Sequence, residues 1–276
     1  MARMLSDEQV GAYAREGYVS PVEAFSPEQA RGYRDLLESA ERSGGELSAD
    51  RRRKMHLYLK WVDEIVRHPR VLDAVQDLIG PDILVFHLTC WIKEARTDAF
   101  VSWHQDSTYF GLDPAEHVTA WVALSPSNLE SGCVQVVPGS HARGQQRHAA
   151  GGDAGNMLKT GQRIDVPDET RIDLMQLQPG QFSLHHTYLF HNSMPNRSPD
   201  RRIGLGISYI PTHCRCGSRQ RLSASLVRGV DRHGNFDLDP APAADFDPQG
   251  MRSHEAAMRR WHAARAELIP KANAAA

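Results

Sequence analysis

Seven short apolar runs in the middle of the chain constrain its fold more than any other feature. They are rich in β-branched and aromatic residues, and Pro138-Gly139 and Pro179-Gly180 punctuate the series. Runs of this length and composition predict β-strands. The predicted strands cover residues 83–92, 99–105, 118–124, 133–137, 172–177, 181–186 and 203–210. Many short strands at this spacing favour an all-β sandwich or barrel.

Helical patterns flank the β-rich region on both sides. Ser6 and Ser26 are each followed by Gln three residues later, which is the capping-box signature of a helix start. Apolar spacing predicts two short helices, one ending before Pro69 and one before Gly80, and a last helix near 253–267. With no repeat and no linker, we expect one domain. It would span residues 1–276, with a helical part over about 5–80, a β-core over about 83–212 and a C-terminal helical extension over about 250–270.

Composition excludes several classes of protein. Lys plus Arg number 32 and Asp plus Glu number 34, a net charge of −2, so the chain lacks the basic field of a nucleic-acid binder. The longest apolar-leaning run, 83–92, is half of the roughly 20 residues that a membrane span needs. Four cysteines make no disulfide scaffold, and no signal peptide is evident. We expect a cytoplasmic protein whose partner is a small molecule, with its oligomeric state left open.

The first chemically informative segment is Trp103-His104-Gln105-Asp106. In a strand, side chains at i and i+2 point to the same face. His104 and Asp106 could therefore bind one metal ion, with Gln105 directed away. Such a triplet also arises by chance, as a surface hydrogen-bonded pair.

A second histidine, His191, ends a later strand, and Arg202 opens the next one eleven residues further on. Two imidazoles and one carboxylate form the facial triad of non-haem Fe(II) oxygenases, which leaves three adjacent coordination positions open. A 2-oxo acid and O₂ can take these positions. The far carboxylate of 2-oxoglutarate would then suit the forked, permanently charged guanidinium of Arg202, with a further hydrogen bond from Ser193.

Two stretches carry a family resemblance. The first runs from Trp103 to His141, and the second is the His-x-Ser-x-Pro-Asn-x-Ser…Arg pattern from His191 to Arg202. Together they resemble the phytanoyl-CoA dioxygenase family, to which ectoine hydroxylases, phosphonate hydroxylases and some halogenases are related. The likeness extends over roughly residues 5–212.

This resemblance implies a mainly β fold with flanking helices and a double-stranded β-helix core, of the jelly-roll or cupin-like kind. It implies Fe(II), 2-oxoglutarate and O₂ as cofactors. It places the metal ligands and catalytic residues at His104, Asp106 and His191, and the 2-oxoglutarate salt bridge at Arg202. The related halogenases carry Ala or Gly in place of the carboxylate. Retention of Asp106 therefore predicts hydroxylation rather than halogenation.

Other histidines and cysteines offer competing interpretations. His185 and His186 are alternatives for the distal ligand, but neither has the Ser and Pro-Asn-x-Ser turn that follow His191. Cys214 and Cys216 would need two further ligands to bind zinc, and none is evident.

Substrate contacts are the least determined part of the sequence. Lys54, His56, Tyr58 and Lys60 alternate with apolar residues, so an extended segment would present one cationic face. We expect this face, together with Arg143, Arg147 and His148, to receive an anionic substrate; the alternative is a solvated surface. Tyr109 and Trp121 flank the predicted metal strands and are candidates for the pocket wall, or for plain core packing.

The sequence thus predicts a 2-oxoglutarate-dependent dioxygenase that hydroxylates an unactivated C–H bond of a small anionic or polar metabolite, such as a secondary metabolite or a phosphonate. Desaturation, epoxidation or C–C cleavage on the same centre stays open. A non-catalytic binding module of the same fold is the remaining alternative.

Overall fold

The computed structural model describes residues 4–44, 47–150, 154–158 and 162–275. The helices are α1 (Asp7–Glu16), α2 (Pro27–Gly44), α3 (Lys60–Val66), α4 (Pro69–Ile79), α5 (Ser107–Phe110) and α6 (Pro248–Ala275), with 3₁₀ turns at Met55–Leu57 and Ser140–Arg143. Both predicted capping boxes are present. Ser6 and Gln9 exchange side-chain-to-backbone hydrogen bonds of 2.9 and 3.2 Å, and Ser26 and Gln29 exchange bonds of 3.0 and 3.3 Å.

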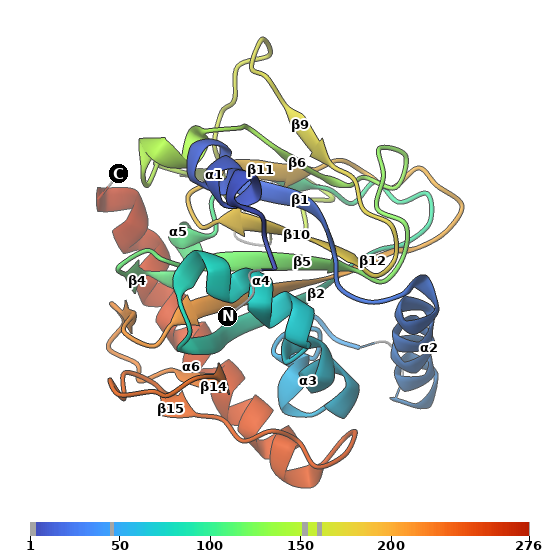
Figure 1. Ribbon diagram of the computed structural model, residues 1–276, viewed down its shortest axis with the longest axis vertical. Helices are drawn as coiled ribbons and strands as arrows, with labels where there is room; N and C mark the ends of the chain where they lie inside the picture. Colours follow the sequence, from blue (N-terminus) through green and yellow to red (C-terminus); the bar gives the residue numbers. More distant parts are fainter. Residues whose placement is uncertain (1–3, 45–46, 151–153, 159–161, 276) are drawn as a thin grey trace.

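Two antiparallel sheets stack to form the core (Figure 1). The larger sheet has the order β1-β10-β5-β12-β2-β14-β15. Its strands are β1 (Tyr18–Glu23), β2 (Ile83–Lys93), β5 (Val118–Ala123), β10 (Gln181–His186), β12 (Arg202–Pro211), β14 (Ser223–Arg228) and β15 (Asp237–Leu238), the last joined in parallel. The smaller sheet has the order β3-β11-β6-β9. Its strands are β3 (Val101–His104), β6 (Val134–Val136), β9 (Asp173–Met175) and β11 (His191–Ser193).

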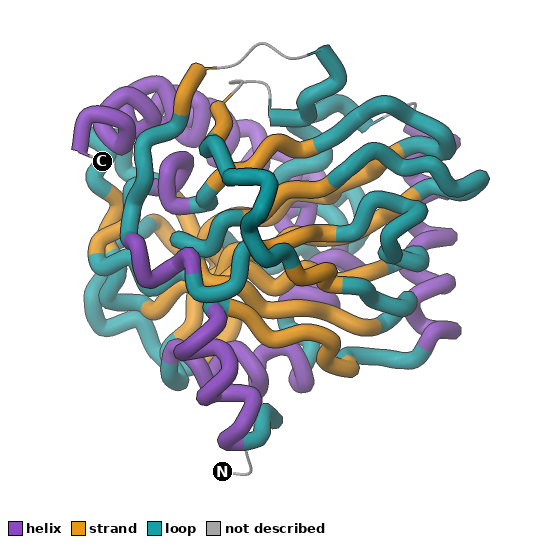
Figure 2. Tube along the Cα trace, turned by 90° about the horizontal axis from the view of Figure 1, so that it is seen from above, coloured by secondary structure: helices purple, strands orange, loops and turns teal. Residues whose placement is uncertain are grey.

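Short ribbons complete the strand inventory of the described residues. β4 (Leu112–Asp113) pairs with β13 (Arg215–Cys216), and β7 (Ala149–Ala150) pairs with β8 (Gln162–Arg163). All seven predicted strands are therefore confirmed, with ends that differ by up to two residues. The sheets form an open sandwich rather than a closed barrel (Figure 2). The predicted jelly-roll type of fold with flanking helices is confirmed.

Strand alternation builds the layers on either side of the large sheet. Along β5, Ala120 and Val122 pack into the core that includes α3 and α4, whereas Trp121 and Ala123 face the cluster shared with the small sheet. The large sheet is thus buried on both faces, which explains why its strands read as nearly continuous apolar runs. On another side, α6 packs against α5, and its Trp261 joins a separate apolar cluster.

The predicted extended segment over residues 54–60 is wrong. The chain instead forms the 3₁₀ turn Met55–Leu57, and α3 begins at Lys60. Lys54, His56 and Tyr58 are buried rather than aligned on a solvated face. Lys54 Nζ donates to the Ser223 carbonyl at 2.8 Å, so a tertiary contact satisfies this polar group that the sequence pattern alone assigns to a surface.

Within the described part of the chain, no helix combines the length and the apolar character required to cross a bilayer. The long segment 143–170 is described apart from residues 151–153 and 159–161.

Candidate metal centre and adjoining cavities

Two imidazoles and one carboxylate meet at the edge of the small sheet. His104 ends β3, His191 begins β11, and the two residues are direct cross-strand partners with ring centroids 4.0 Å apart. Asp106 Oδ1 lies 3.8 Å from His104 Nε2 and 3.7 Å from His191 Nε2. One potential ligand atom from each of the three lies within 4.8 Å of the others. The structure therefore brings the three predicted ligands together.

Asp106 reaches this group by a different route from the one predicted. β3 stops at His104, and Asp106 has helical φ and ψ of −65° and −36° at the start of α5. The expectation that both residues share one strand face is wrong, because the chain turns between them. Gln105 does point away, since its amide donates to the carbonyls of Gly144 and Tyr188 at 2.8 and 2.7 Å.

The backbone holds both imidazoles in the form that can bind a metal. His104 Nδ1 lies 2.8 Å from the Ser102 carbonyl, and His191 Nδ1 lies 3.0 Å from the Leu189 carbonyl. A carbonyl only accepts, so each Nδ1–H donates and each Nε2 keeps its lone pair on the side of Asp106. Burial lowers the pKa of both histidines, which keeps them neutral. The donor set therefore fits a divalent cation such as Fe(II).

A chain of hydrogen bonds holds the other oxygen of Asp106. The Thr119 hydroxyl donates to Asp106 Oδ2 at 2.7 Å, so its oxygen must accept from His117 Nε2–H at 3.0 Å. His117 Nδ1 then accepts from the Thr187 hydroxyl at 3.0 Å. Burial lowers the pKa of His117 to about 3, in accord with this neutral tautomer. Although burial alone would raise the pKa of Asp106, the adjacent imidazoles, His191 first, hold it well below its usual range.

The two rival histidines lie in different surroundings. His185 Nε2 is 3.5 Å from Asp106 Oδ2, and its ring is 4.7 Å from that of His191, but it is not part of the three-residue group. His186 faces the other way, toward Tyr13 and His141. His191 is thus the residue that the fold brings to the potential ligand position.

A small cavity adjoins the group and contains the predicted co-substrate residues. Arg202 and Ser193 line it together with His104, Asp106 and His191. Arg202 is 1% exposed, and its guanidinium lies 5.1 Å from the centre of the Trp121 ring. Trp121, predicted as a substrate contact, therefore belongs to this smaller cavity.

Lys93 is a buried residue beside this cavity that the sequence reasoning missed. Its side-chain Nζ lies within hydrogen-bond distance of Ser193 Oγ at 2.7 Å, of the Ser193 carbonyl at 3.0 Å and of the Met194 carbonyl. Burial, with the adjacent charge of Arg202, lowers the pKa of Lys93 to about 6. Because Ser193 Oγ can accept from Lys93, its own hydrogen is free to be donated elsewhere. Direct pairing of Lys93 with Arg202 across β2 and β12 exists only in the tertiary structure.

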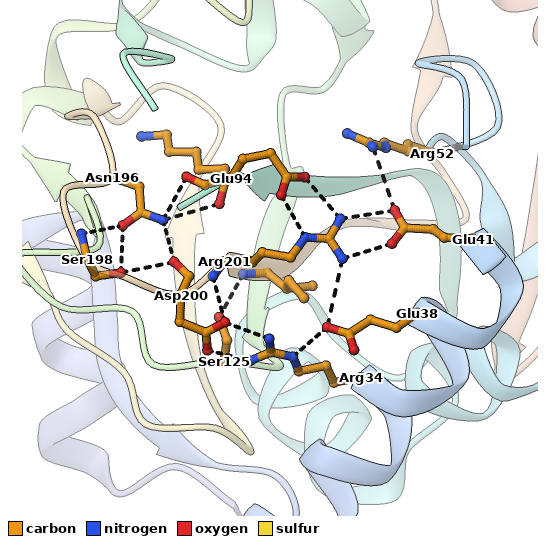
Figure 3. Close-up of polar contacts among 12 residues, drawn as sticks. Arg34, Glu38, Glu41, Arg52, Glu94, Ser125, Asn196, Ser198, Asp200 and Arg201 are labelled. Carbon is orange, nitrogen blue, oxygen red and sulfur yellow. Dashed lines mark hydrogen bonds and ion pairs between the residues drawn. The ribbon is translucent and has the colours of Figure 1, made fainter. Parts of the chain in front are cut away.

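Asn196 explains the Pro-Asn-x-Ser part of the motif. Its side-chain NH₂ donates to the carbonyls of Lys93, Glu94 and Asp200 at 3.2, 3.0 and 2.7 Å. Its carbonyl oxygen accepts from the backbone and hydroxyl of Ser198 at 2.9 and 2.7 Å (Figure 3). This amide closes the turn between His191 and Arg202 and ties it to β2.

Arg201, the residue just before Arg202, lies in an ion network (Figure 3). Its guanidinium pairs with Glu41 at 2.8 Å and with Glu94 at 3.0 Å, and Arg34 of α2 pairs with Asp200 at 2.6 Å. Arg201, just before β12, thus joins the ion network, whereas Arg202, the first residue of β12, lines the small cavity.

A larger cavity, of about 510 Å³, is also lined by His104 and Asp106. Tyr109, for which the sequence left pocket wall and core packing open, lines this cavity and also belongs to a buried apolar cluster. Lys60 and Tyr58 do not line either cavity: Lys60 begins α3, and the buried Tyr58 hydroxyl donates to the Arg51 carbonyl at 2.5 Å.

The predicted cationic loop residues also fail to reach the larger cavity. Arg143, Arg147 and His148 are absent from its described lining, and His148 accepts a 3.0 Å hydrogen bond from the Gln105 backbone. The cations that do line it are Arg52, Arg53 and Arg265. The basic run Arg51–Lys54 could have pointed to Arg52 and Arg53 as cavity residues, whereas nothing in the sequence distinguished Arg265 from other helical arginines.

A sandwich core that presents two imidazoles and one carboxylate at a common point defines the class of mononuclear non-haem iron oxygenases. Comparison with solved structures agrees. The apo form of the non-heme monooxygenase ThoJ is 31% identical with a TM-score of 0.84, over 95% of this chain and 99% of that one. CytC3 with Fe(II) and alpha-ketoglutarate is 22% identical with a TM-score of 0.67, over 89% of this chain and 97% of that one, and shows the shared fold alone.

Sequence comparison gives the family. Residues 4–204 match the phytanoyl-CoA dioxygenase (PhyH) family, and the chain belongs to it. A probable alpha-ketoglutarate-dependent hypophosphite dioxygenase of Stutzerimonas stutzeri is 28% identical over 157 residues, 56% of this chain and 54% of that protein. The 1-deoxypentalenic acid 11-beta-hydroxylase of Streptomyces exfoliatus is 28% identical over 153 residues, 52% of this chain and 53% of that protein. The matched region is thus about half the length of these curated relatives.

The resemblance to this family is confirmed. The hypophosphite dioxygenase is named as alpha-ketoglutarate-dependent, and CytC3 was solved with Fe(II) and alpha-ketoglutarate. The prediction of iron and 2-oxoglutarate, with O₂, as the cofactors of this class is therefore confirmed.

Proposed function

We propose that the chain is a dioxygenase that uses Fe(II), 2-oxoglutarate and O₂ to hydroxylate an unactivated C–H bond of a small polar or anionic metabolite, with release of succinate and CO₂. The observation that carries this proposal is the meeting of His104, Asp106 and His191 within 4.8 Å, beside a cavity that contains Arg202. A buried arginine next to an iron-type donor set needs an anion, and 2-oxoglutarate supplies one while its oxo acid end chelates the metal.

Each residue has a defined part in this proposal. His104, Asp106 and His191 would hold the metal on one face, and Arg202 and Ser193 would bind the far carboxylate of 2-oxoglutarate. When bound, iron and 2-oxoglutarate supply the oxidising chemistry. The protein contributes position and a dry, polarised surrounding: Arg202 and the histidines of the group are buried.

The two cavities would bind different molecules. The small one holds the predicted co-substrate residues, and the larger one, which also opens on His104 and Asp106, is left for the metabolite. Since its lining comes from the Arg52 region, β2 and α6, the cavity supports our prediction that residues 1–276 act as one dioxygenase domain. The relatives act by name on hypophosphite, an oxyanion, and on 1-deoxypentalenic acid, an organic acid, which supports a polar or anionic substrate.

An anaerobic titration tests the proposal. Addition of Fe(II) and then 2-oxoglutarate to the full chain should produce the weak visible charge-transfer band of the metal–2-oxoglutarate chelate. His104→Ala should abolish the band. Arg202→Gln should weaken 2-oxoglutarate binding by about 2–3 kcal/mol, because a charge-assisted hydrogen bond is lost in a buried site.

Lys60→Met serves as the control, because Lys60 lies outside both cavities. Failure of the unmodified protein to form the band would exclude the proposed function. Once a substrate is found, product mass distinguishes hydroxylation from desaturation, epoxidation or C–C cleavage.

A further inference from the structure

We propose that the larger cavity binds an amphipathic acid, whose carboxylate or phosphonate is held by Arg265 with Arg53 beside it, and whose apolar body lies against the aromatic wall. This inference rests on the proposed function and names the substrate class of the same site. Arg265 belongs to α6, which lies wholly beyond the residues 4–204 that match the family.

The wall of the cavity is apolar and aromatic. Trp91, Tyr109, Phe110 and Trp261 line it, joined by Met157 and Leu158. Aromatic faces of this kind bind ring systems and alkyl chains through buried area and ring contacts. A cavity of about 510 Å³ is within the roughly 300–1,000 Å³ of small-molecule sites. A hypophosphite-sized ion alone would leave most of this wall without contact, so the ligand should carry a hydrophobic body.

Positive charge in this cavity exceeds negative charge. Among the described residues that line it, Asp106 is the one carboxylate, and that group is turned to the metal centre. Arg52 is partly compensated by Glu41 at 3.7 Å. Arg53 is compensated by Asp50 at 2.8 Å, although Asp50 also accepts from His262 at 3.0 Å.

Arg265 is the cation that the protein leaves least compensated. Its guanidinium lies 5.3 Å from the centre of the Tyr109 ring, and its Nε is buried without a hydrogen-bond partner among the described residues. Arg53 and Arg265 both line the cavity. Burial and then the charge of Arg53 lower the pKa of Arg265, against smaller opposing effects of Tyr109 and Asp50. A partly buried, forked donor beside a second arginine is well suited to bind an oxyanion with two oxygens.

Tyr109 also relates this anion site to the metal centre. Its ring centroid is 6.1 Å from that of His104 on one side and 5.3 Å from the Arg265 guanidinium on the other. An acid held by Arg265 would therefore lie beside the same tyrosine ring that adjoins the metal ligand His104. The reactive C–H bond should lie on the apolar body, several bonds from the acid group.

Matched acids and neutral analogues test the proposal. The full chain, loaded anaerobically with Fe(II) and 2-oxoglutarate, is titrated with 2-naphthoate, cyclohexylacetate and phenylphosphonate, and with 2-naphthamide, cyclohexylacetamide and dimethyl phenylphosphonate. The charge-transfer band reports each binding event. We expect at least one acid to bind tenfold or more tightly than its neutral analogue, and Arg265→Gln to remove that preference while the band itself still forms.

Arg259→Gln is the matched control, since it removes the same charge from an exposed position on the same helix. Arg265→Lys, which keeps the charge without the fork, should lose binding several-fold and replaces Arg265→Gln if that variant folds poorly. The proposal is overturned if no acid is preferred over its analogue, or if Arg265→Gln keeps the preference. Absence of the band in the unmodified protein would instead contradict the proposed function, and calorimetry with the metal-free protein would still decide on the anion site.

Discussion

Thr119 connects Asp106 to a one-way series of hydrogen-bond donors. Thr187 donates to His117, His117 donates to Thr119, and Thr119 donates to Asp106, so the direction of each hydrogen bond in this chain is fixed. The carboxylate is thereby turned so that Oδ1 faces His104 and His191. Partners of this kind orient metal ligands and raise metal affinity.

We therefore expect Thr119→Val to weaken binding of Co(II) or Ni(II) by roughly 10–100-fold, because Asp106 loses the donor that sets its orientation. Competition titration with a chromophoric chelator measures the dissociation constant. Thr119→Ser keeps the hydroxyl and should stay within a few-fold of the parent protein. Equal affinities for the Val and Ser variants would show that the hydroxyl does not position the carboxylate.

At the scale of elements, β12 brings Arg202, the proposed 2-oxoglutarate ligand, next to a tryptophan because two of its residues, both glycines, have no side chain. Gly204 and Gly206 lie on one face of this strand, two residues apart, opposite Trp121 and Trp91. A Cβ on Gly204 would overlap the Trp121 ring, whereas on Gly206 it would meet Trp91 Nε1 at 3.1 Å. The large indole that contacts Arg202 thus fills the space above Gly204.

Gly204→Ala should lower the free energy of unfolding by about 2–3 kcal/mol, as overpacking of a tight core does, and raise the KM for 2-oxoglutarate as Trp121 shifts. Gly206→Ala is the matched control, with an expected loss below about 1 kcal/mol because a small movement of Trp91 suffices. Urea unfolding measures both variants. Similar losses for the two would mean that Trp121 is not packed as described.

At the scale of the whole molecule, folding buries several histidines in neutral form. His56, His87 and His117 are at most 4% exposed. Burial lowers the pKa of each, to about 3 for His117 and well below the usual value for the other two. The unfolded chain therefore binds more protons than the folded chain once the pH falls below about 6.5.

The free energy of unfolding should consequently be greatest at neutral pH and fall as the solution is acidified. Each fully neutral buried histidine contributes a slope of about 1.4 kcal/mol per pH unit, so these three together contribute about 4 kcal/mol per unit below pH 6. Urea unfolding of the metal-free protein at pH 7.5, 6.0 and 5.5 measures the slope. His87→Phe should reduce this slope by about 1.4 kcal/mol per pH unit, the contribution of one buried histidine. An unchanged slope in this variant would contradict the assignment.

Local patterns in the sequence were sufficient for the strands, both capping boxes and the family. They proposed His104, Asp106, His191, Ser193 and Arg202 as site residues, and the structure brings these five side chains to one small cavity. They placed Asp106 on a strand, however, where the structure has a turn into α5. Residue type and spacing therefore predicted which groups come together but not the backbone path between them.

Tertiary structure alone decided the surroundings of the site. Lys93 meets Ser193, and α6 brings Arg265 to Tyr109, through contacts between segments 100 or more residues apart. Of the cationic face predicted over Lys54–Lys60, Lys54, His56 and Tyr58 are buried, and Arg52, Arg53 and Arg265 line the cavity instead. Short-range patterns depend on the period of one helix or strand, whereas a pocket depends on how distant elements pack, and no single segment records that information.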